Sequence, residues 1–457
     1  MKRGDLIREK RKSRFIYFMM VLSFVAIFTL SSTNAWAFID FVRIIGYNAD
    51  SLGRGGTSIA VGDGPSDMNV NPAVISKVQG NSLETNLFIL VPTLDYEYDG
   101  TGGQTHTSHD KDTLLVAPGM SFNGKIDNSP WSWGLSLAAP DAIASDYTIQ
   151  SKYFGPVNGY AKYLHLRLSP GIAYQVSQNL SVGARLGIDN ETFDLRMPLG
   201  LAYLDIGQCN GFGFSGAVGI LYKPIEKLSI GLYYESPSYM QDLESRDDDG
   251  YIGLMTPGGR VNFSNLDVDV KDLNSPQNFG VGIAWTPSPA WRFSADVKYF
   301  DWDKDWDEIE VKFSGSGAAA LKAAGLPTTL KVPLNIDDQV TFGVGAEYFF
   351  GEIYKLSLGY HYNNNAMNDN SYIPYAPAAV DHTMTCGFSV RPAKNVKLSI
   401  AYMYSIFADM DASDYHGFDK SLEKQLGLPQ GALDSELNGS SVEYDAHALQ
   451  LSVVVSW

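Results

Sequence analysis

Short segments in which apolar residues alternate with small or polar ones recur along most of this chain. At the C-terminal end, one face of such a segment carries Leu449, Leu451, Val453, Val455 and Trp457, while the other carries Gln450, Ser452, Val454 and Ser456. The same period of two appears at residues 180–188, 228–234, 354–362 and 396–404. A repeat of two residues is the signature of a β-strand with two unlike faces. The chain is therefore expected to be all-β.

The lengths of the connections decide how the apolar faces are covered. In a soluble sandwich such a face packs against a second sheet, whereas in an outer-membrane barrel it meets lipid. Tight links alternate with much longer ones along this chain, the tight ones lying near residues 123–130, 177–179, 223–227, 287–290, 351–352 and 391–395. Short turns at one rim and long loops at the other are typical of a transmembrane barrel.

The alternating segments between residues 81 and 457 number fourteen if 259–287 is one long, irregular eighth strand. That stretch contains Asn274-Ser275-Pro276 and could also be divided into two strands. Bacterial single-chain barrels have even strand counts, which favours the merged strand. The prediction is a 14-stranded antiparallel transmembrane β-barrel over residues 81–457.

Residues 1–37 have the organisation of a secretory signal peptide. A basic stretch precedes the uncharged run 15–30, and Ala35-Trp36-Ala37 supplies the small-x-small pattern for cleavage after Ala37. An uncleaved anchor is the alternative. Removing these residues, which carry seven basic and two acidic side chains, changes the formal net charge from −17 to −22. This acidic balance argues against nucleic acid as a partner, and localisation to the bacterial outer membrane is expected.

The segment from residue 38 to residue 80 lacks the period of two. Asn71 followed by Pro72 predicts a helix N-cap with proline at the first helical position. Fourteen strands enclose a lumen too wide for wall side chains alone to fill. Apolar residues are spread through this glycine-rich segment, so it is expected to be a partly helical plug; a disordered periplasmic leader is the alternative.

The pattern Ser51-Leu52-Gly53-Arg54, a small-residue stretch to Asp63, and then Asn71-Pro72-Ala73 resembles the N-terminal hatch of the FadL/TodX family. Members of that family transport long-chain fatty acids and aromatic hydrocarbons across the outer membrane. The segments 278–283, 300–302 and 340–345 also resemble family barrel segments. The likeness covers essentially the whole chain after the signal peptide.

This resemblance implies capture of hydrophobic cargo among outer loops, transfer to a site touching the hatch, and sideways exit into lipid at a kink in the third strand. The implied ligand-binding or hatch residues are Phe38, Ser51, Leu52, Gly53, Arg54, Asn71, Pro72 and Ala73. Pro140 interrupts the third strand and cannot donate a ladder hydrogen bond, so it is the candidate kink, or alternatively a strand edge. In the segments 318–327 and 418–428, apolar residues recur at helical spacing. Each segment is either an apolar surface that captures cargo or a helix that caps its loop without contacting cargo.

Several other sites are weighed and rejected. The run 301–307 alternates aspartates but fails the calcium-loop pattern, which leaves a solvated strand end, and the acidic loop 247–250 is taken as a solvated outer loop. His106, His109, Asp110 and Asp112 form only a weak metal set. No nucleophile with a matching base stands out, so we expect no enzyme activity, no cofactor and no metal.

The expected partners are hydrophobic small molecules, outer-membrane lipids and lipopolysaccharide, and the chain is expected to act as a monomer. Two other functions stay open. A general porin needs an open lumen, and a surface protein for adhesion or structure needs no apolar pocket beside Phe38.

Overall fold

The computed structural model describes residues 40–99, 104–111, 115–245, 250–367, 380–407, 410–412 and 420–457. The expected signal peptide, its cleavage site and the candidate residue Phe38 lie outside the described residues, as do Asp112 and residues 247–249 of the acidic loop.

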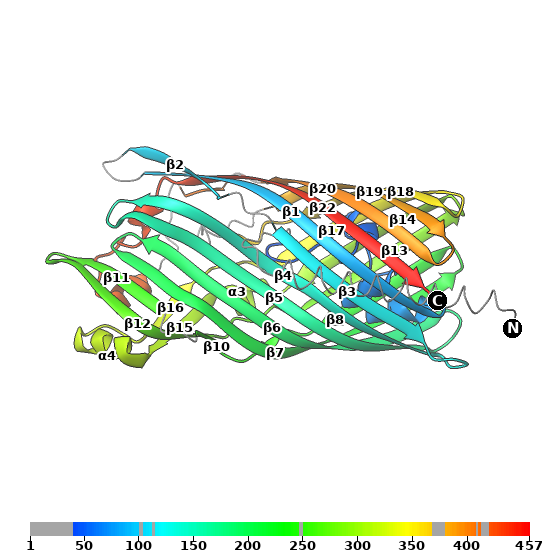
Figure 1. The fold of residues 1–457 in the computed structure, drawn as a ribbon, viewed down its shortest axis with the longest axis horizontal. Coiled ribbons are helices and arrows are strands. Elements are labelled where there is room, and N and C mark those ends of the chain that lie inside the picture. The colour runs from blue at the N-terminus through cyan, green and yellow to red at the C-terminus, as the bar shows by residue number, and fades with distance from the viewer. Residues whose placement is uncertain are drawn as a thin grey trace, which may run out of the picture.

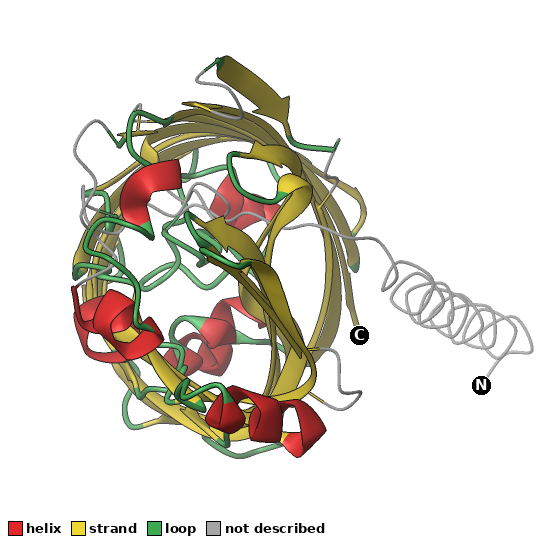
Figure 2. Ribbon diagram, turned by 90° about the vertical axis from the view of Figure 1, so that its left-hand side faces the viewer, coloured by secondary structure: helices red, strands yellow, loops and turns green. Residues whose placement is uncertain are grey.

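Fourteen antiparallel strands form a closed wall, seen from the side in Figure 1 and nearly end-on in Figure 2. The wall strands are β1 (Asn81–Asp99), β3 (Leu115–Lys125), β4 (Trp131–Ser151), β5 (Gly155–Gln175), β6 (Leu180–Leu199), β7 (Ala202–Ile225), β8 (Leu228–Glu235), β13 (Asn278–Ser288), β14 (Trp291–Phe300), β17 (Gln339–Phe350), β18 (Tyr354–Asn363), β19 (Val380–Ala393), β20 (Val396–Phe407) and β22 (Ser441–Ser456). The ring closes where β1 pairs with β22, from Ser82 opposite Ser456 to Glu97 opposite Ser441. The predicted 14-stranded antiparallel barrel is confirmed.

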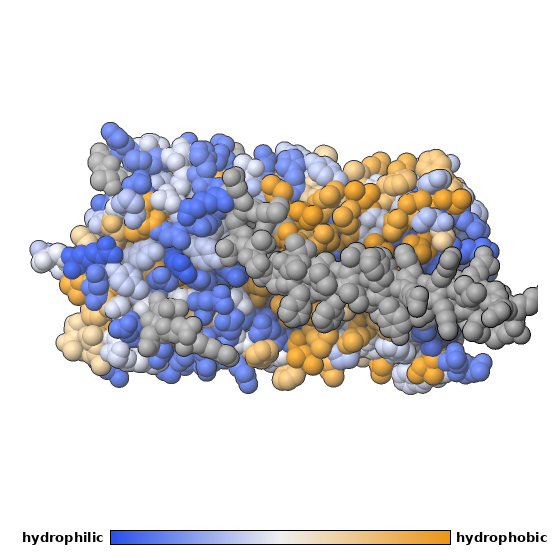
Figure 3. All heavy atoms as spheres, viewed as in Figure 1, coloured by the Kyte–Doolittle hydropathy of each residue, from blue (hydrophilic) through white to orange (hydrophobic). Residues whose placement is uncertain are grey.

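The period of two in the sequence separates the two faces of this wall. In β6, Arg185 and Asp189 point into the lumen and are buried, whereas the intervening Leu186 is 67% exposed on the outer surface. Figure 3 shows such apolar residues gathered over the part of the barrel nearest the C-terminus, while the opposite part is mostly hydrophilic. An apolar outer band of this kind is the surface that a transmembrane barrel presents to lipid.

The two rims differ as the spacing predicts. Tight turns gather at the rim near the C-terminus, here called the short-turn end, for example between β5 and β6 and between β17 and β18. Longer connections at the opposite rim, here called the outer end, carry the remaining strands and four helices. They are β2 (Thr105–His109), β9 (Tyr239–Met240), β10 (Leu243–Ser245), β11 (Gly250–Thr256), β12 (Gly259–Lys271), α3 (Trp302–Trp306), β15 (Glu308–Ser314), α4 (Gly315–Ala323), β16 (Thr329–Pro333), β21 (Met410–Asp411), α5 (Lys420–Leu426) and η3 (Asp434–Glu436). Among the described residues, no helix has both the length and the apolar character to cross a bilayer.

The prediction that 259–287 forms one wall strand was wrong. The eighth wall strand is β13 alone, which pairs with β8 and β14. Residues 259–271 form β12, which pairs with β11 and β15 and extends a sheet at the outer end (Figure 1). A period of two identifies a strand but not its neighbours, so an outer-sheet strand and a wall strand look alike in sequence.

Residues 40–80, here called the luminal segment, run inside the barrel. The segment contains α2 (Ala49–Leu52), η1 (Pro65–Asn69) and η2 (Pro72–Lys77). Asn71 caps η2 as predicted, because its side chain accepts a hydrogen bond from the backbone N–H of Ala73. Apolar side chains from the start of this segment join the main hydrophobic core, which continues through inward wall residues into the outer sheet.

Inward-facing glycines of the wall let the luminal segment approach the strands closely. A β-carbon on Gly359 in β18 would lie 2.0 Å from the backbone nitrogen of Gly55, and one on Gly183 in β6 would lie 2.5 Å from that of Ala73. Neither approach leaves room for a side chain. The luminal segment can therefore pack this closely against the two strands only because glycine occupies both positions.

Replacing Gly359 by valine is expected to displace the luminal segment and open the lumen, because the clash is with backbone. The matched control is Gly216→Val in β7, where the nearest atom to an added β-carbon lies 3.7 Å away. Single-channel conductance in planar bilayers should show a large, stable open state for Gly359→Val alone. Equal conductance of the two variants would contradict the close-approach argument.

Candidate functional site

A small apolar cavity lies where the luminal segment meets the wall. Its volume is about 40 Å³, and it is lined by Phe41, Val42, Ile143, Ala161, Lys162, Tyr163, Phe193, Leu195, Trp306, Leu334, Ile336 and Met367. Lys162 lies between the inward-facing Ala161 and Tyr163, so the alternation of β5 directs its side chain outward. The interior offers apolar atoms alone, in a space close to that of a single water molecule. A larger occupant therefore requires side chains or the luminal segment to move.

Phe41 enters this cavity from a strained turn. Asp40 and Arg43 exchange two backbone hydrogen bonds of 3.0 Å, and Phe41 between them has a φ of 56°. A bulky residue in the left-handed region costs on the order of 1–3 kcal/mol and persists only where its surroundings hold it. The aromatic ring is held by edge contacts with Trp302 and Trp306, at 5.0 and 5.2 Å between ring centroids.

The two tryptophans correct the interpretation of residues 301–307 as a solvated strand end. These residues form the short helix α3, in which Trp302 is 0% and Trp306 5% exposed, while Asp303 and Lys304 face solvent. The spacing of four residues places both indoles on the buried face of this helix, together with Asp305. The signal was visible in the sequence, but nothing there showed what the indoles would pack against.

Pro140 marks an irregularity in β4, the third wall strand. The register with β5 shifts between Ala138 and Asp141, which is a β-bulge. Pairing of β4 with β3 ends at Leu137 opposite Met120. Beyond that point the luminal segment takes over, because Ile44 donates to the carbonyl of Pro140 and Ala142 donates to the carbonyl of Val42, at 3.0 and 2.8 Å. Pro140 thus lies where the hydrogen-bonded neighbour of β4 changes from β3 to the luminal segment.

A buried charge cluster lies beside the point where β4 changes its neighbour. Arg43 forms a two-pronged ion pair with Asp141, at 2.6 Å from Nε and 3.0 Å from Nη2. Asp141 also bonds Nδ1 of His165, whose Nε2 bonds Asp189. Paired hydrogen bonds from one guanidinium to one carboxylate are among the stronger polar contacts. They tie the turn at Phe41 to the bulge in β4.

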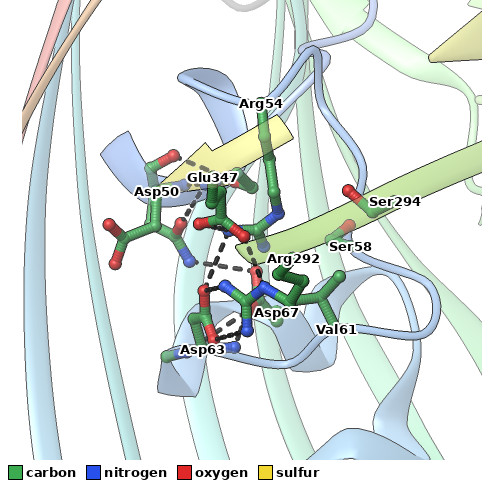
Figure 4. A network of polar contacts seen from close by, with 12 residues as sticks. Asp50, Arg54, Ser58, Val61, Asp63, Asp67, Arg292, Ser294 and Glu347 are labelled. Atoms are coloured by element: carbon green, nitrogen blue, oxygen red, sulfur yellow. Dashed lines mark hydrogen bonds and ion pairs between the residues drawn. The ribbon is translucent and has the colours of Figure 1, made fainter. Parts of the chain in front are cut away.

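A second charge cluster holds the luminal segment near the short-turn end (Figure 4). Asp50 bonds Lys355 at 2.7 Å and Lys397 at 2.5 Å. Burial alone would raise the pKa of Asp50, but these two ammonium groups outweigh it and hold that pKa well below its usual range.

The same cluster includes pairs around Asp63. Asp63 accepts from Arg54 at 3.0 Å and pairs with Arg292 of β14, which also pairs with Glu347 of β17. The luminal segment is therefore joined by buried or half-buried charges to four wall strands, β14, β17, β18 and β20.

The residues singled out in the sequence divide between two places. Ser51, Leu52, Gly53 and Arg54 lie in and just after α2 among these anchoring contacts. Asn71, Pro72 and Ala73 lie on the other side, where η2 packs against β5, β6 and β7. None of these seven residues lines the apolar cavity. Pro140 lies beside it, because this part of β4 is hydrogen-bonded to the turn that carries the cavity residue Val42.

The cavity residues themselves were not found from sequence. Phe193 and Leu195 share the inward face of β6 with Arg185 and Asp189, so the change from charged to apolar along that face was a usable signal. Leu334, Ile336 and Met367 come from outer connections, where no local pattern indicates burial. Among the described residues, no group of three or more His, Cys, Asp or Glu could hold a metal ion.

A closed 14-stranded barrel with an apolar outer band is the fold of an outer-membrane channel. The family model described as outer membrane protein transport protein (OMPP1/FadL/TodX) matches residues 41–449. This chain belongs to that family. No curated protein matches it by sequence.

Several solved structures share the fold of this chain. The toluene transporter TodX of Pseudomonas putida has 18% sequence identity and a TM-score of 0.71, with 90% of this chain and 99% of that chain covered. The toluene transporter TbuX of Ralstonia pickettii has 18% identity and a TM-score of 0.66, covering 90% and 98%. A Pseudomonas aeruginosa FadL homologue has 14% identity and a TM-score of 0.69, covering 91% and 99%. At these identities the likeness shows the fold.

Family membership confirms several expectations. The chain is an outer-membrane transport protein for hydrophobic compounds, and the family consists of channels, not enzymes.

Replacing Asp50 by alanine is expected to loosen the luminal segment, because it leaves Lys355 and Lys397 buried without their shared partner. Breaking a buried pair in this way costs about 3–5 kcal/mol. Hydrogen exchange should rise across residues 49–67 while the wall strands stay protected. The exposed Asp127 at the turn after β3 provides the control variant Asp127→Ala, which should leave exchange unchanged. Unaltered exchange in Asp50→Ala would rule out an anchoring role.

Proposed function

We propose that the apolar cavity is the binding site for a small, neutral hydrocarbon on its way through the outer membrane. The observation that carries this proposal is the chemistry of the cavity wall, which is apolar and contains the aromatic rings of Phe41, Tyr163, Phe193 and Trp306. Burying apolar area stabilises a bound molecule by roughly 25 cal/mol per Å². Aromatic rings add favourable edge and stacking contacts with an aromatic guest.

The same wall argues against a carboxylate guest at this position. Burying a charged group without a partner is strongly unfavourable. The nearest cation on the luminal segment, Arg43, is already paired with Asp141 and contacts Glu235 at 3.5 Å. Long-chain fatty acids are therefore the second choice, and monoaromatic or aliphatic hydrocarbons the first. TodX and TbuX, which share the fold, are toluene transporters.

The route we propose begins among the outer connections and ends sideways in the membrane. Cargo captured at the outer end reaches the cavity, and the turn at residues 40–44 then moves away from β4. Support comes from the position of the bulge: above Leu137, β4 no longer pairs with β3, and Pro118 in β3 and Pro140 in β4 each lack a backbone donor. Among the described residues, the luminal segment and a few outer contacts cover that edge.

In this proposal the parts of the chain have separate roles. Residues 1–37 are a cleaved signal peptide, 38–80 form the hatch, and 81–457 form the barrel. Phe38 leads into the moving turn, Ser51, Leu52, Gly53 and Arg54 together with Asn71, Pro72 and Ala73 anchor the hatch, and Pro140 allows the lateral opening. Two backbone hydrogen bonds and the Arg43–Asp141 pair must break for the turn to move.

The cavity is tested by placing a charge in it. Phe193→Asp in β6 is expected to reduce uptake of radiolabelled toluene by at least about tenfold, because a buried unpaired carboxylate costs several kcal/mol. Phe193→Leu, which keeps the wall apolar, should retain most of the uptake. Cells lacking their own hydrophobic-compound transporter provide the background, with oleate as the second substrate. Oleate uptake without toluene uptake by the unaltered protein would move the assignment to fatty acids.

The lateral route is tested by locking the turn to β4. Val42→Cys with Ala142→Cys, in a chain with Cys209→Ala and Cys386→Ala, joins a hydrogen-bonded cross-strand pair of suitable separation. Uptake should be lost when the disulfide forms and return on reduction, while either single cysteine stays active. Full uptake by the oxidised double variant would exclude movement of this turn from the transport cycle.

A further inference from the structure

A polar cavity lies at the short-turn end, between η2 and the wall, away from the apolar cavity. Its volume is about 220 Å³, and it is lined by Ser76, Lys77, Gln79, Lys125, Gln175, Gln178, Asn179, Ser181, Leu221 and Lys223. Among the described residues, three lysines line it and no carboxylate does. This composition is unusual for a chain whose formal net charge is −17.

The two wall lysines point into the lumen. Lys125 continues the inward face of β3 after the buried Ser121 and Asn123, and Lys223 follows the buried Leu221 on the inward face of β7. Neither ammonium has an ion-pair or hydrogen-bond partner among the described residues. Both charges are therefore available to a ligand.

The third lysine comes from the luminal segment. Lys77 at the end of η2 donates to the backbone carbonyls of Ala60 and Val61, at 3.0 and 2.5 Å. Burial and, to a smaller extent, the nearby charge of Lys223 together lower the pKa of Lys77 to about 7, against the opposing influence of Asp63 and Asp67. The ammonium groups of plug and wall thus repel each other across the cavity.

The cations extend into a neighbouring cavity of about 480 Å³ that shares Lys77 and Gln79. Arg391, Lys394 and Lys397 line that cavity, and within the described part of the chain Asp63 is its one acidic lining residue. Asp63 is already paired with Arg54 and Arg292. The lining of these two cavities at the short-turn end is consequently basic.

We propose that the 220 Å³ cavity is a binding site for a phosphate group, which joins the luminal segment to the wall. Three ammonium groups surround the anion, and the amides of Gln79, Gln175, Gln178 and Asn179 with the hydroxyls of Ser76 and Ser181 supply neutral donors. Charge-assisted hydrogen bonds to phosphate oxygens are strong and directional. The volume is several times the roughly 30 Å³ that one water occupies in the liquid.

In this proposal, the bound ligand attaches the luminal segment to the wall at a second place. A bound anion turns repulsion among Lys77, Lys125 and Lys223 into attraction to a shared partner. It would secure the η2 side of the luminal segment while the turn at residues 40–44 stays free to move. Either inorganic phosphate or the headgroup of an anionic phospholipid could supply this chemistry, since the short-turn end faces the periplasm in barrels of this kind.

The site is tested by binding of inorganic phosphate to the purified full-length barrel in detergent, measured by equilibrium dialysis at constant ionic strength. Lys223→Gln is expected to weaken binding about tenfold, since one charge-assisted contact is lost. Lys227→Gln is the matched control, because Lys227 lies in the turn that follows β7, donates to the carbonyl of Pro287 and does not line the cavity. A heat-modifiable band on a gel verifies folding, and Lys125→Gln replaces Lys223→Gln if the latter fails to fold.

The source of the phosphate is decided in nanodiscs. If a lipid headgroup occupies the site, binding of inorganic phosphate persists in phosphatidylcholine discs and disappears in discs containing phosphatidylglycerol. If free phosphate is the ligand, binding is equal in both. No saturable binding in detergent or in phosphatidylcholine discs, or equal binding by wild type and Lys223→Gln, would overturn the proposal.

Discussion

The wall of a membrane barrel must pair every backbone N–H and C=O, because lipid offers no partner. The ring closed by β1 and β22 meets this condition around the circumference. At β4 beyond Leu137, the partners come from elsewhere: from the turn at residues 40–44, and from Lys111, which donates to the carbonyl of Asp146. Wall and luminal segment are therefore one hydrogen-bonded system. In the lateral route that we propose, an opening beside β4 requires the luminal segment to move, so its movement and cargo release would be coupled.

The ion pairs inside the lumen are distributed unevenly along the luminal segment. Many of them bind the part around Asp50 and Asp63, and few bind the turn at residues 40–44. Around Asp50 and Asp63, four wall strands contribute basic or acidic partners, and most charges of this cluster have more than one partner. At the turn, by contrast, Arg43 with Asp141 is the main ionic contact, and Phe41 sits in a strained conformation. The proposed route relies on this difference, with the strained turn as the part that moves and the anchored part staying in place.

The apolar cavity shows which contacts the sequence predicts and which it does not. Alternation along β5 and β6 predicts which side chains face inward, including Tyr163 and Phe193. It does not predict that Phe41 or Trp306 meets them, since these residues come from a turn and a short outer helix. The same limit explains the error at residues 259–287, where the strand pattern was correct but the neighbour was not. Partners distant in sequence are selected by closure of the whole ring.

The sequence by itself determined the strands, their two faces, the alternation of short and long connections, the N-cap at Asn71 and the membership of a transport family. These features depend on local periodicity and on motifs, which a chain carries without its neighbours. Only the tertiary structure decided which strand is the eighth, where β4 leaves β3, that Phe41 packs with two tryptophans, and that three lysines share one cavity. The physical reason is that contacts between distant segments depend on barrel register and on the path of the luminal segment, and a period of two carries no information about either.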